Sequence, residues 1–214
     1  MNANGRVVTG FSHPYVAKYN NNGGTVTYTD GMRLARGVNV SLDVEVSEGN
    51  DFYADNEVAE SENGQFSKGK LNLTVDGLHP EAERFVLGLP EPVTKQIGED
   101  KTVNIQQYPA AVEAPYVGVG FIIEYRSGGV DLYVPMIVTK GKFQTPGTKA
   151  DTREDSRNWQ TQDLVADIAR DDTPKHNWKW VADGQTTEAE ADAILQALLG
   201  ITAAAAEPEA AAEG

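Results

Sequence analysis

Few residues in this chain of 214 amino acids have the types and spacing that chemistry requires. The three histidines, His13, His79 and His176, lie far apart, and none has a second histidine at metal-ligand spacing. The absence of cysteine excludes thiol catalysis, disulfides and cysteine-bound metal clusters. The sequence also lacks a nucleophile elbow, a phosphate-binding loop and a dinucleotide fingerprint. We therefore expect no enzyme, no cofactor and no bound metal.

Two groups of acidic residues are the alternatives to that expectation. Segment 50–57 offers oxygen ligands for calcium, but it departs from EF-hand spacing and lacks the glycine of that loop. Other carboxylates resemble acid–base pairs of a hydrolase. They are Asp171 and Asp172, and Asp151, Glu154 and Asp155. Surface acids are so common in this chain that a solvated role is the simpler interpretation of both groups.

The three tryptophans are a candidate for sugar binding. Trp178 and Trp180 are two residues apart, so in a strand they lie on the same side, and Trp159 could add a third ring. Aromatic side chains more often fill a core or an interface. A surface or decoration module that binds a glycan or a partner protein is the alternative function that these residues leave open.

The charge of the chain is strongly acidic and unevenly distributed. Eighteen Lys and Arg face thirty-two Asp and Glu, which gives a net charge of −14. This balance disfavours a general electrostatic grip on nucleic acid and a polybasic membrane anchor. Segment 43–62 holds eight acids and no base, and segment 171–214 holds nine acids and two lysines. Such clusters favour solubility, or line a path along which a polyanion passes without adhering.

No segment has the features of a membrane span or a signal peptide. No apolar stretch approaches the roughly 18 residues that a spanning helix needs. The first residues, 1–6, contain no apolar region of the kind found in secretory signals. We expect a chain that is made in the cytoplasm and has no membrane partner.

Two segments with alternating apolar and polar residues predict the central strands. Segment 38–47 alternates strictly, with Val40 and Leu42 on the side expected to face the core, and segment 68–76 follows the same rule. If the two strands pair antiparallel, cross-strand ion pairs form, each worth a few tenths of a kcal/mol. The residues concerned are Asp43, Glu45, Lys68 and Lys70. The polar link between the strands, 48–65, predicts a long loop.

Further strands are predicted on both sides of this pair. A Gly-Gly turn joins 116–125 to 130–139, and Gly118 and Gly120 in the first of these strands mark a bulge or a close backbone approach. Other strands are expected at 15–19, 25–28, 103–107 and 178–181.

Two helices are predicted, at 80–87 and at 188–199. Pro80 suits the first helical position, and Thr187 with Glu190 has the spacing of a capping box. The apolar stripe of the second helix is expected to contain Ala191, Ile194, Leu195, Leu198 and Ile201. The fold class is therefore mainly β, a β-sandwich or partly closed barrel with one or two flanking helices.

The order of these segments resembles the major tail proteins of long-tailed, non-contractile bacteriophages. The resemblance spans roughly residues 5–182, and its most specific pieces are Tyr53-Ala54-Asp55-Asn56 and Lys140-Gly141-Lys142-Phe143. The other matching segments are 25–28, 38–47, 69–78, 87–88, 115–121 and 138–139. It implies a tail-tube β domain over 1–182, followed by a C-terminal helical segment over 183–201. The remaining segment, 202–214, is an Ala- and Glu-rich tail that we expect to be disordered.

The resemblance also implies a function in the virion tail. Such proteins form hexameric rings that stack into a tube around a tape-measure protein and contact other tail proteins, and DNA later passes through the lumen without specific binding. The fold that it implies is a β-sandwich with a flanking helix, a long inter-strand loop and terminal arms.

Two sets of residues are candidates for the contacts of such a tube. The inter-ring loop would use Asp51, Phe52, Tyr53, Asp55, Asn56, Glu57, Glu60 and Glu62, because long polar loops are usually functional or disordered. The lumen face would use Asn39, Ser41, Asp43, Glu45, Lys70, Asn72 and Thr74, the polar sides of the two central strands. A lumen that conducts DNA should be neutral or negative, because each phosphate held by a lysine adds friction.

Overall fold

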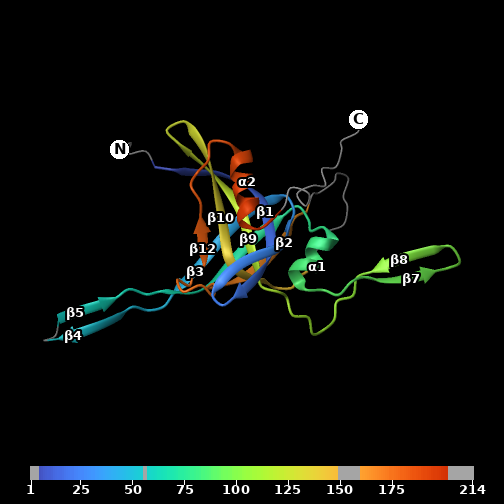
Figure 1. The fold of residues 1–214 in the computed structure, drawn as a ribbon, viewed down its shortest axis with the longest axis horizontal. Coiled ribbons are helices and arrows are strands. Elements are labelled where there is room, and N and C mark those ends of the chain that lie inside the picture. Colours follow the sequence, from blue (N-terminus) through green and yellow to red (C-terminus); the bar gives the residue numbers. More distant parts are fainter. Residues whose placement is uncertain (1–4, 55–56, 149–159, 202–214) are drawn as a thin grey trace.

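The computed structural model describes residues 5–54, 57–148 and 160–201, which form strands and two helices (Figure 1). In chain order the elements are β1 (Val7–Asn22), β2 (Thr25–Arg33), β3 (Gly37–Val46), β4 (Asn50–Ala54), β5 (Glu57–Glu62), β6 (Phe66–Val75), α1 (Pro80–Leu87), β7 (Val93–Ile97), β8 (Lys101–Ile105), β9 (Val117–Ser127), β10 (Val130–Phe143), β11 (Gln162–Ala169), β12 (Lys179–Val181) and α2 (Glu188–Leu198).

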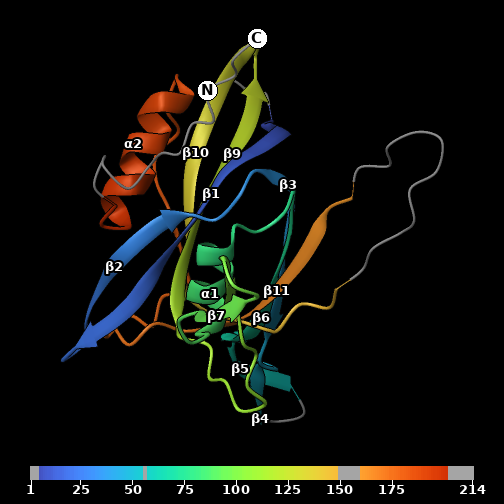
Figure 2. The same cartoon turned by 90° about the vertical axis from the view of Figure 1, so that its right-hand side faces the viewer.

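One antiparallel sheet of eight strands forms the body. Its order is β2-β1-β9-β10-β11-β6-β3, with β12 paired to β10, so β2 and β3 lie at its two edges and the sheet is not closed. The long strand β10 joins the two halves, because it pairs with β9 over most of its length and with β11 only over Lys140–Phe143. Figure 2 shows the two halves facing each other around α1. The predicted mainly β fold with flanking helices is confirmed.

Two hydrophobic clusters lie on opposite faces of β1, β9 and β10. Val16 belongs to the cluster inside the bent sheet, whereas its neighbours Tyr15 and Ala17 belong to the cluster beneath α2. This alternation follows from the period of two in a strand. The inner cluster also takes in α1 and the buried face of β6 and β11. Both faces of this half of the sheet are therefore covered.

The predicted hairpins and helices are confirmed. Gly23-Gly24 and Gly128-Gly129, all with positive φ, make the two turns, and α1 spans the predicted residues. The hydroxyl of Thr187 accepts a hydrogen bond from the backbone N–H of Glu190 at 3.3 Å, which is one of the two bonds of a capping box. One detail is wrong: Leu198 is 42% exposed, and Leu199 is buried against the sheet instead.

Gly118 and Gly120 permit a close approach, as predicted. A side chain at Gly118 would collide with the ring of Tyr28, and one at Gly120 would collide with Leu195 and Leu199 of α2. The glycines therefore let β2 and α2 pack directly on the backbone of β9.

Three features differ from the prediction. The link over 48–65 is not a loop, because β4 and β5 pair as a hairpin within it. Strands β7 and β11 were not predicted. The apolar side of β3 is only partly covered, since Val40 and Leu42 are half-buried while Val44 and Val46 are exposed. The reason is that β3 is an edge strand with a neighbour on one side only.

Among the described residues, no helix is both long and apolar enough to cross a membrane.

Candidate functional site

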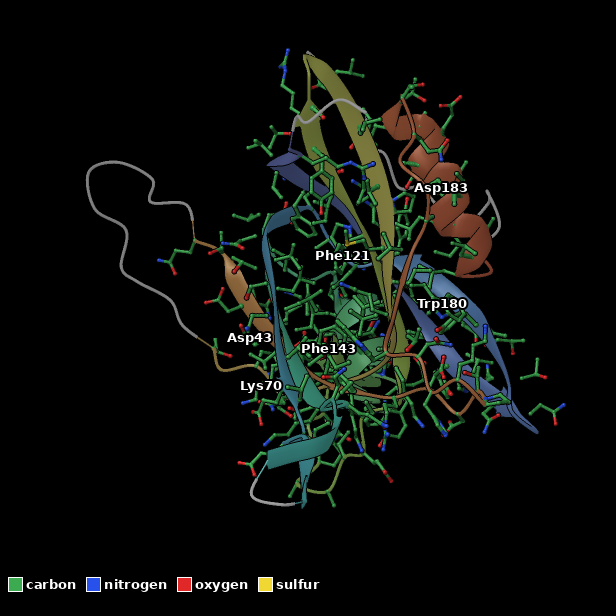
Figure 3. The ribbon with its side chains drawn as sticks, turned by 90° about the vertical axis from the view of Figure 1, so that its left-hand side faces the viewer. Asp43, Lys70, Phe121, Phe143, Trp180 and Asp183 are labelled. Atoms are coloured by element: carbon green, nitrogen blue, oxygen red, sulfur yellow. The ribbon has the colours of Figure 1, made fainter. Side chains whose placement is uncertain are left out.

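The seven residues predicted for the lumen face lie together on the outer face of β3 and β6. Antiparallel pairing places Asp43 opposite Lys70, Ser41 opposite Asn72, and Asn39 opposite Thr74. Glu45 stands opposite Lys68 in the same register, as predicted. Figure 3 shows Asp43 and Lys70 on the outer side of the sheet, while Phe121 and Phe143 lie within the body. The sequence periodicity therefore assigned the two faces of these strands correctly.

Short polar contacts connect this face. The amide of Asn72 donates to Asp43 at 2.7 Å and to Ser41 at 3.2 Å. The hydroxyl of Thr74 donates to Asp163 of β11 at 2.7 Å. Lys68 Nζ lies 3.2 Å from Glu45, an exposed ion pair worth roughly 0–1 kcal/mol. The side chains thus neutralise and orient one another across the strands.

Strand β11 adds two carboxylates that the sequence analysis missed. Asp167 stands opposite Lys70, so this lysine lies between Asp43 and Asp167 in the ladder. Asp163 stands opposite Thr74. The face of β3, β6 and β11 then holds four carboxylates, namely Asp43, Glu45, Asp163 and Asp167, against Lys68 and Lys70, and Lys142 of the next strand, β10, stands opposite Asp167. Its net charge is negative, and both lysines have acidic neighbours in register.

The segment predicted as the inter-ring loop is a hairpin arm that extends from the body (Figure 1). Register places Phe52 opposite Glu60 and Tyr53 opposite Val58. Asp51, Glu57 and Glu62 also belong to this hairpin, whereas Asp55 and Asn56 lie outside the described residues. The arm does not pack extensively against any other described helix or strand.

The root of this arm is held by hydrogen bonds between the segment that enters it and the segment that leaves it. The N–H of Ser47 donates to the carbonyl of Gln65 at 2.7 Å, and the N–H of Gln65 donates to the Ser47 hydroxyl at 3.0 Å. Gly64 is required at this point, because a side chain there would collide with the carbonyl oxygen of Ser47. At the root of the arm, the two segments that connect it to the body are therefore close together and hydrogen-bonded to each other.

Asp171 and Asp172, the acid–base candidates of the sequence, are engaged in hydrogen bonds with neighbouring segments. Asp172 accepts hydrogen bonds from Lys140 and from the hydroxyl of Tyr19, both at 2.8 Å, and the bond from Lys140 lowers the pKa of its carboxyl. Asp171 is buried and accepts a hydrogen bond of 2.6 Å from the hydroxyl of Thr173. Burial raises the pKa of Tyr19 to about 12. These contacts attach the segment after β11 to β1 and β10.

The other carboxylate candidates, Asp151, Glu154 and Asp155, lie outside the described residues. Part of the calcium candidate 50–57 does so too. Within the ranges that the structure describes, no group of three or more His, Asp or Glu side chains is placed to hold a metal ion.

Trp178 and Trp180 do not form one aromatic platform. Trp178 precedes β12 and stacks on Phe66, with ring centroids 5.0 Å apart, at the edge of the inner cluster. Trp180 packs against the ring of Tyr28 in the cluster beneath α2. The prediction that both rings share one side is wrong, because the two residues contact opposite clusters. Trp159 lies outside the described residues.

A hollow of about 700 Å³ is lined by side chains of several elements. Asp76, Glu83 and Asp163 contribute carboxylates to it, and Tyr108 a phenol whose pKa is raised by burial and by a hydrogen bond to Glu83. The rest of the lining consists of amide and hydroxyl side chains with glycine and proline. This lining offers acids and neutral polar groups.

No protein-family model matches this chain, and no curated protein matches it either. The resemblance of the sequence to tail proteins therefore stays a prediction.

Proposed function

We propose that this chain is a structural subunit of a bacteriophage tail tube. Copies associate edge to edge into rings, the rings stack around a tape-measure protein, and DNA passes through the lumen. The number of six subunits in a ring comes from the resemblance of the sequence. The observation that carries the proposal is the open sheet, whose outer face beside one edge is polar and net negative.

The two edges of the sheet suit association into a ring. β3 offers ten residues of edge strand, and its exposed Val38 adds apolar surface beside the unpaired backbone. A long exposed edge with apolar side chains is a template for pairing with another chain. β2 forms the other edge of the same sheet. A contact between unlike edges is heterologous, and it makes a ring when the rotation closes.

The charge of the β3–β6–β11 face suits the wall of a DNA channel. Duplex DNA carries about one negative charge per 1.7 Å, so unpaired basic side chains would hold it. On this face both lysines stand opposite carboxylates, and carboxylates are in excess. The face would therefore repel or pass DNA rather than bind it.

The β4–β5 arm suits the contact between rings. It extends away from the body and does not pack extensively against the rest of its own subunit (Figure 1). An isolated two-stranded hairpin is marginally stable in water, so a neighbouring subunit would complete it.

Negative-stain electron microscopy of the purified protein tests this proposal. We expect rings with a central hole or hollow tubes at high protein concentration. A uniformly monomeric protein would contradict the proposal. If that monomer also bound glycans and lost the binding on Trp178→Ala, the binding module would be the better function.

A further inference from the structure

The second hairpin, β7–β8, forms another arm of the fold. It projects from the side of the body opposite the β4–β5 arm (Figure 1). At its root the amide of Gln106 donates to the carbonyl of Pro90 at 2.8 Å, and Arg84 of α1 lies 3.5 Å from Glu91. Proline has a fixed φ, so Pro90 and Pro92 stiffen the strand that enters the hairpin. One ion pair therefore links the root of the arm to α1.

The two faces of this hairpin differ in chemistry. Paired residues of a hairpin share a face, and the register pairs Val93 with Ile105 and Val103 with Lys95. One face therefore carries Val93, Lys95, Ile97, Lys101, Val103 and Ile105. The other carries Thr94, Gln96, Thr102 and Asn104, and the hydroxyl of Thr94 donates to Asn104 at 2.8 Å. The hairpin thus has an apolar face with two lysines and a neutral polar face.

The apolar face has no cover within the described chain. Val93, Ile97 and Ile105 are 41%, 55% and 38% exposed. The hairpin packs extensively against no other described element. A two-stranded hairpin is only marginally stable in water, and a further strand or another packed element stabilises it. A fitting partner would present apolar side chains together with carboxylates for Lys95 and Lys101.

The chain itself carries that complementary surface, at the end of β3 from which the β4–β5 arm emerges. Val44 and Val46 are exposed there. The segment that follows them, 48–62, holds six acids and no base. The β7–β8 hairpin and the β4–β5 arm extend in opposite directions, so the two surfaces cannot meet within one copy (Figure 1). They can meet when copies follow one another head to tail.

We infer that the β7–β8 hairpin docks, through its apolar face with Lys95 and Lys101, on the exposed end of β3 and the acidic arm of a second copy. The role of this contact, a second link between successive rings, rests on the proposed function. The contact joins unlike surfaces, so it propagates in one direction through the assembly.

Disulfide trapping tests this contact, because the natural chain has no cysteine. In the double variant Ile97→Cys/Val46→Cys, mild oxidation should link copies into a ladder of dimers, trimers and larger species on a denaturing gel. Each single variant can give dimers at most. The matched control is Gln96→Cys/Val46→Cys, which moves the thiol by one residue to the opposite face of the hairpin. We expect the control to give at least a fivefold lower yield of the ladder than the Ile97→Cys/Val46→Cys variant. Adding Lys95→Glu/Lys101→Glu to the Ile97→Cys/Val46→Cys variant should lower the yield by at least the same factor.

The same samples are examined by electron microscopy, which separates this inference from the proposed function. Tubes without a preferential ladder from the Ile97→Cys/Val46→Cys pair would overturn the inference but would still support the proposed function. A ladder without tubes would support the contact and count against the tube, and the absence of both would contradict both. If the first pair does not fold, judged by circular dichroism, Ile105→Cys/Val44→Cys gives a second test on the same two faces, with Asn104→Cys/Val44→Cys as its control.

Discussion

Leu42 and Leu71 face each other across the β3–β6 ladder, but they differ in burial. Leu71 is fully buried in the inner cluster, whereas Leu42 only packs against its margin. Replacing a buried leucine by alanine costs about 2–5 kcal/mol, the sum of lost transfer energy and a residual cavity. We therefore expect Leu71→Ala to lower the free energy of unfolding by about 3–4 kcal/mol. For Leu42→Ala, where water already reaches part of the side chain and no closed cavity remains, we expect about 1–2 kcal/mol.

The assay is urea unfolding of both variants at a protein concentration where sedimentation shows monomers. The natural protein and Leu198→Ala, at an exposed position of α2, serve as references. A cost for Leu42→Ala equal to or above that of Leu71→Ala would refute the assignment of β3 to an edge of the sheet. The comparison also revises the larger cost, about 2–4 kcal/mol, that strict alternation alone predicts for Leu42.

Three further perturbations address the β4–β5 arm, the β3–β6–β11 face and Tyr19. Deleting Asp51–Glu62 should leave the melting temperature of the body nearly unchanged but prevent stacking of rings in electron micrographs, and normal tubes would remove this arm from the interface. Replacing Asp163 and Asp167 by lysine should make the β3–β6–β11 face basic and produce DNA retention that weakens with salt in a mobility-shift assay; unchanged mobility would count against a face exposed to DNA. At alkaline pH, Tyr19 keeps its proton in the folded state up to a pKa of about 12 but loses it near 10 when unfolded. Its contribution to stability is therefore complete below pH 10 and is lost as the pH rises from about 10 to 12, so Tyr19→Phe should flatten the loss of stability in urea titrations across that range.

The sequence predicted those parts of the fold in which local pattern and burial agree. The strict alternation of 38–47 and 68–76 identified β3, β6 and their polar face, and the register of the structure then pairs Asp43 with Lys70. Helix caps and glycine turns identified both helices and two hairpins, because these signals depend only on neighbouring residues.

The remainder depends on contacts between distant segments. Strand β11 alternates Leu164, Ala166 and Ile168 toward the core, but small alanines and the half-buried Val165 weaken the pattern. Asp163 and Asp167 therefore joined the candidate site only when the strand order was known. Neither arm lies against the core, so burial does not impose a strong alternation of apolar and polar residues on its strands. For this reason β4–β5 was predicted as a loop and β7 was not predicted.

The central claim is that copies associate into a hollow tube with the β3–β6–β11 face toward the lumen. A cryo-electron microscopy reconstruction of the assembled protein measures this directly. We expect stacked rings in which Asp43, Lys70 and Asp167 line the channel and both hairpin arms lie between rings. An assembly with this face on its outer surface, or a protein that stays monomeric at every concentration tested, would contradict the claim.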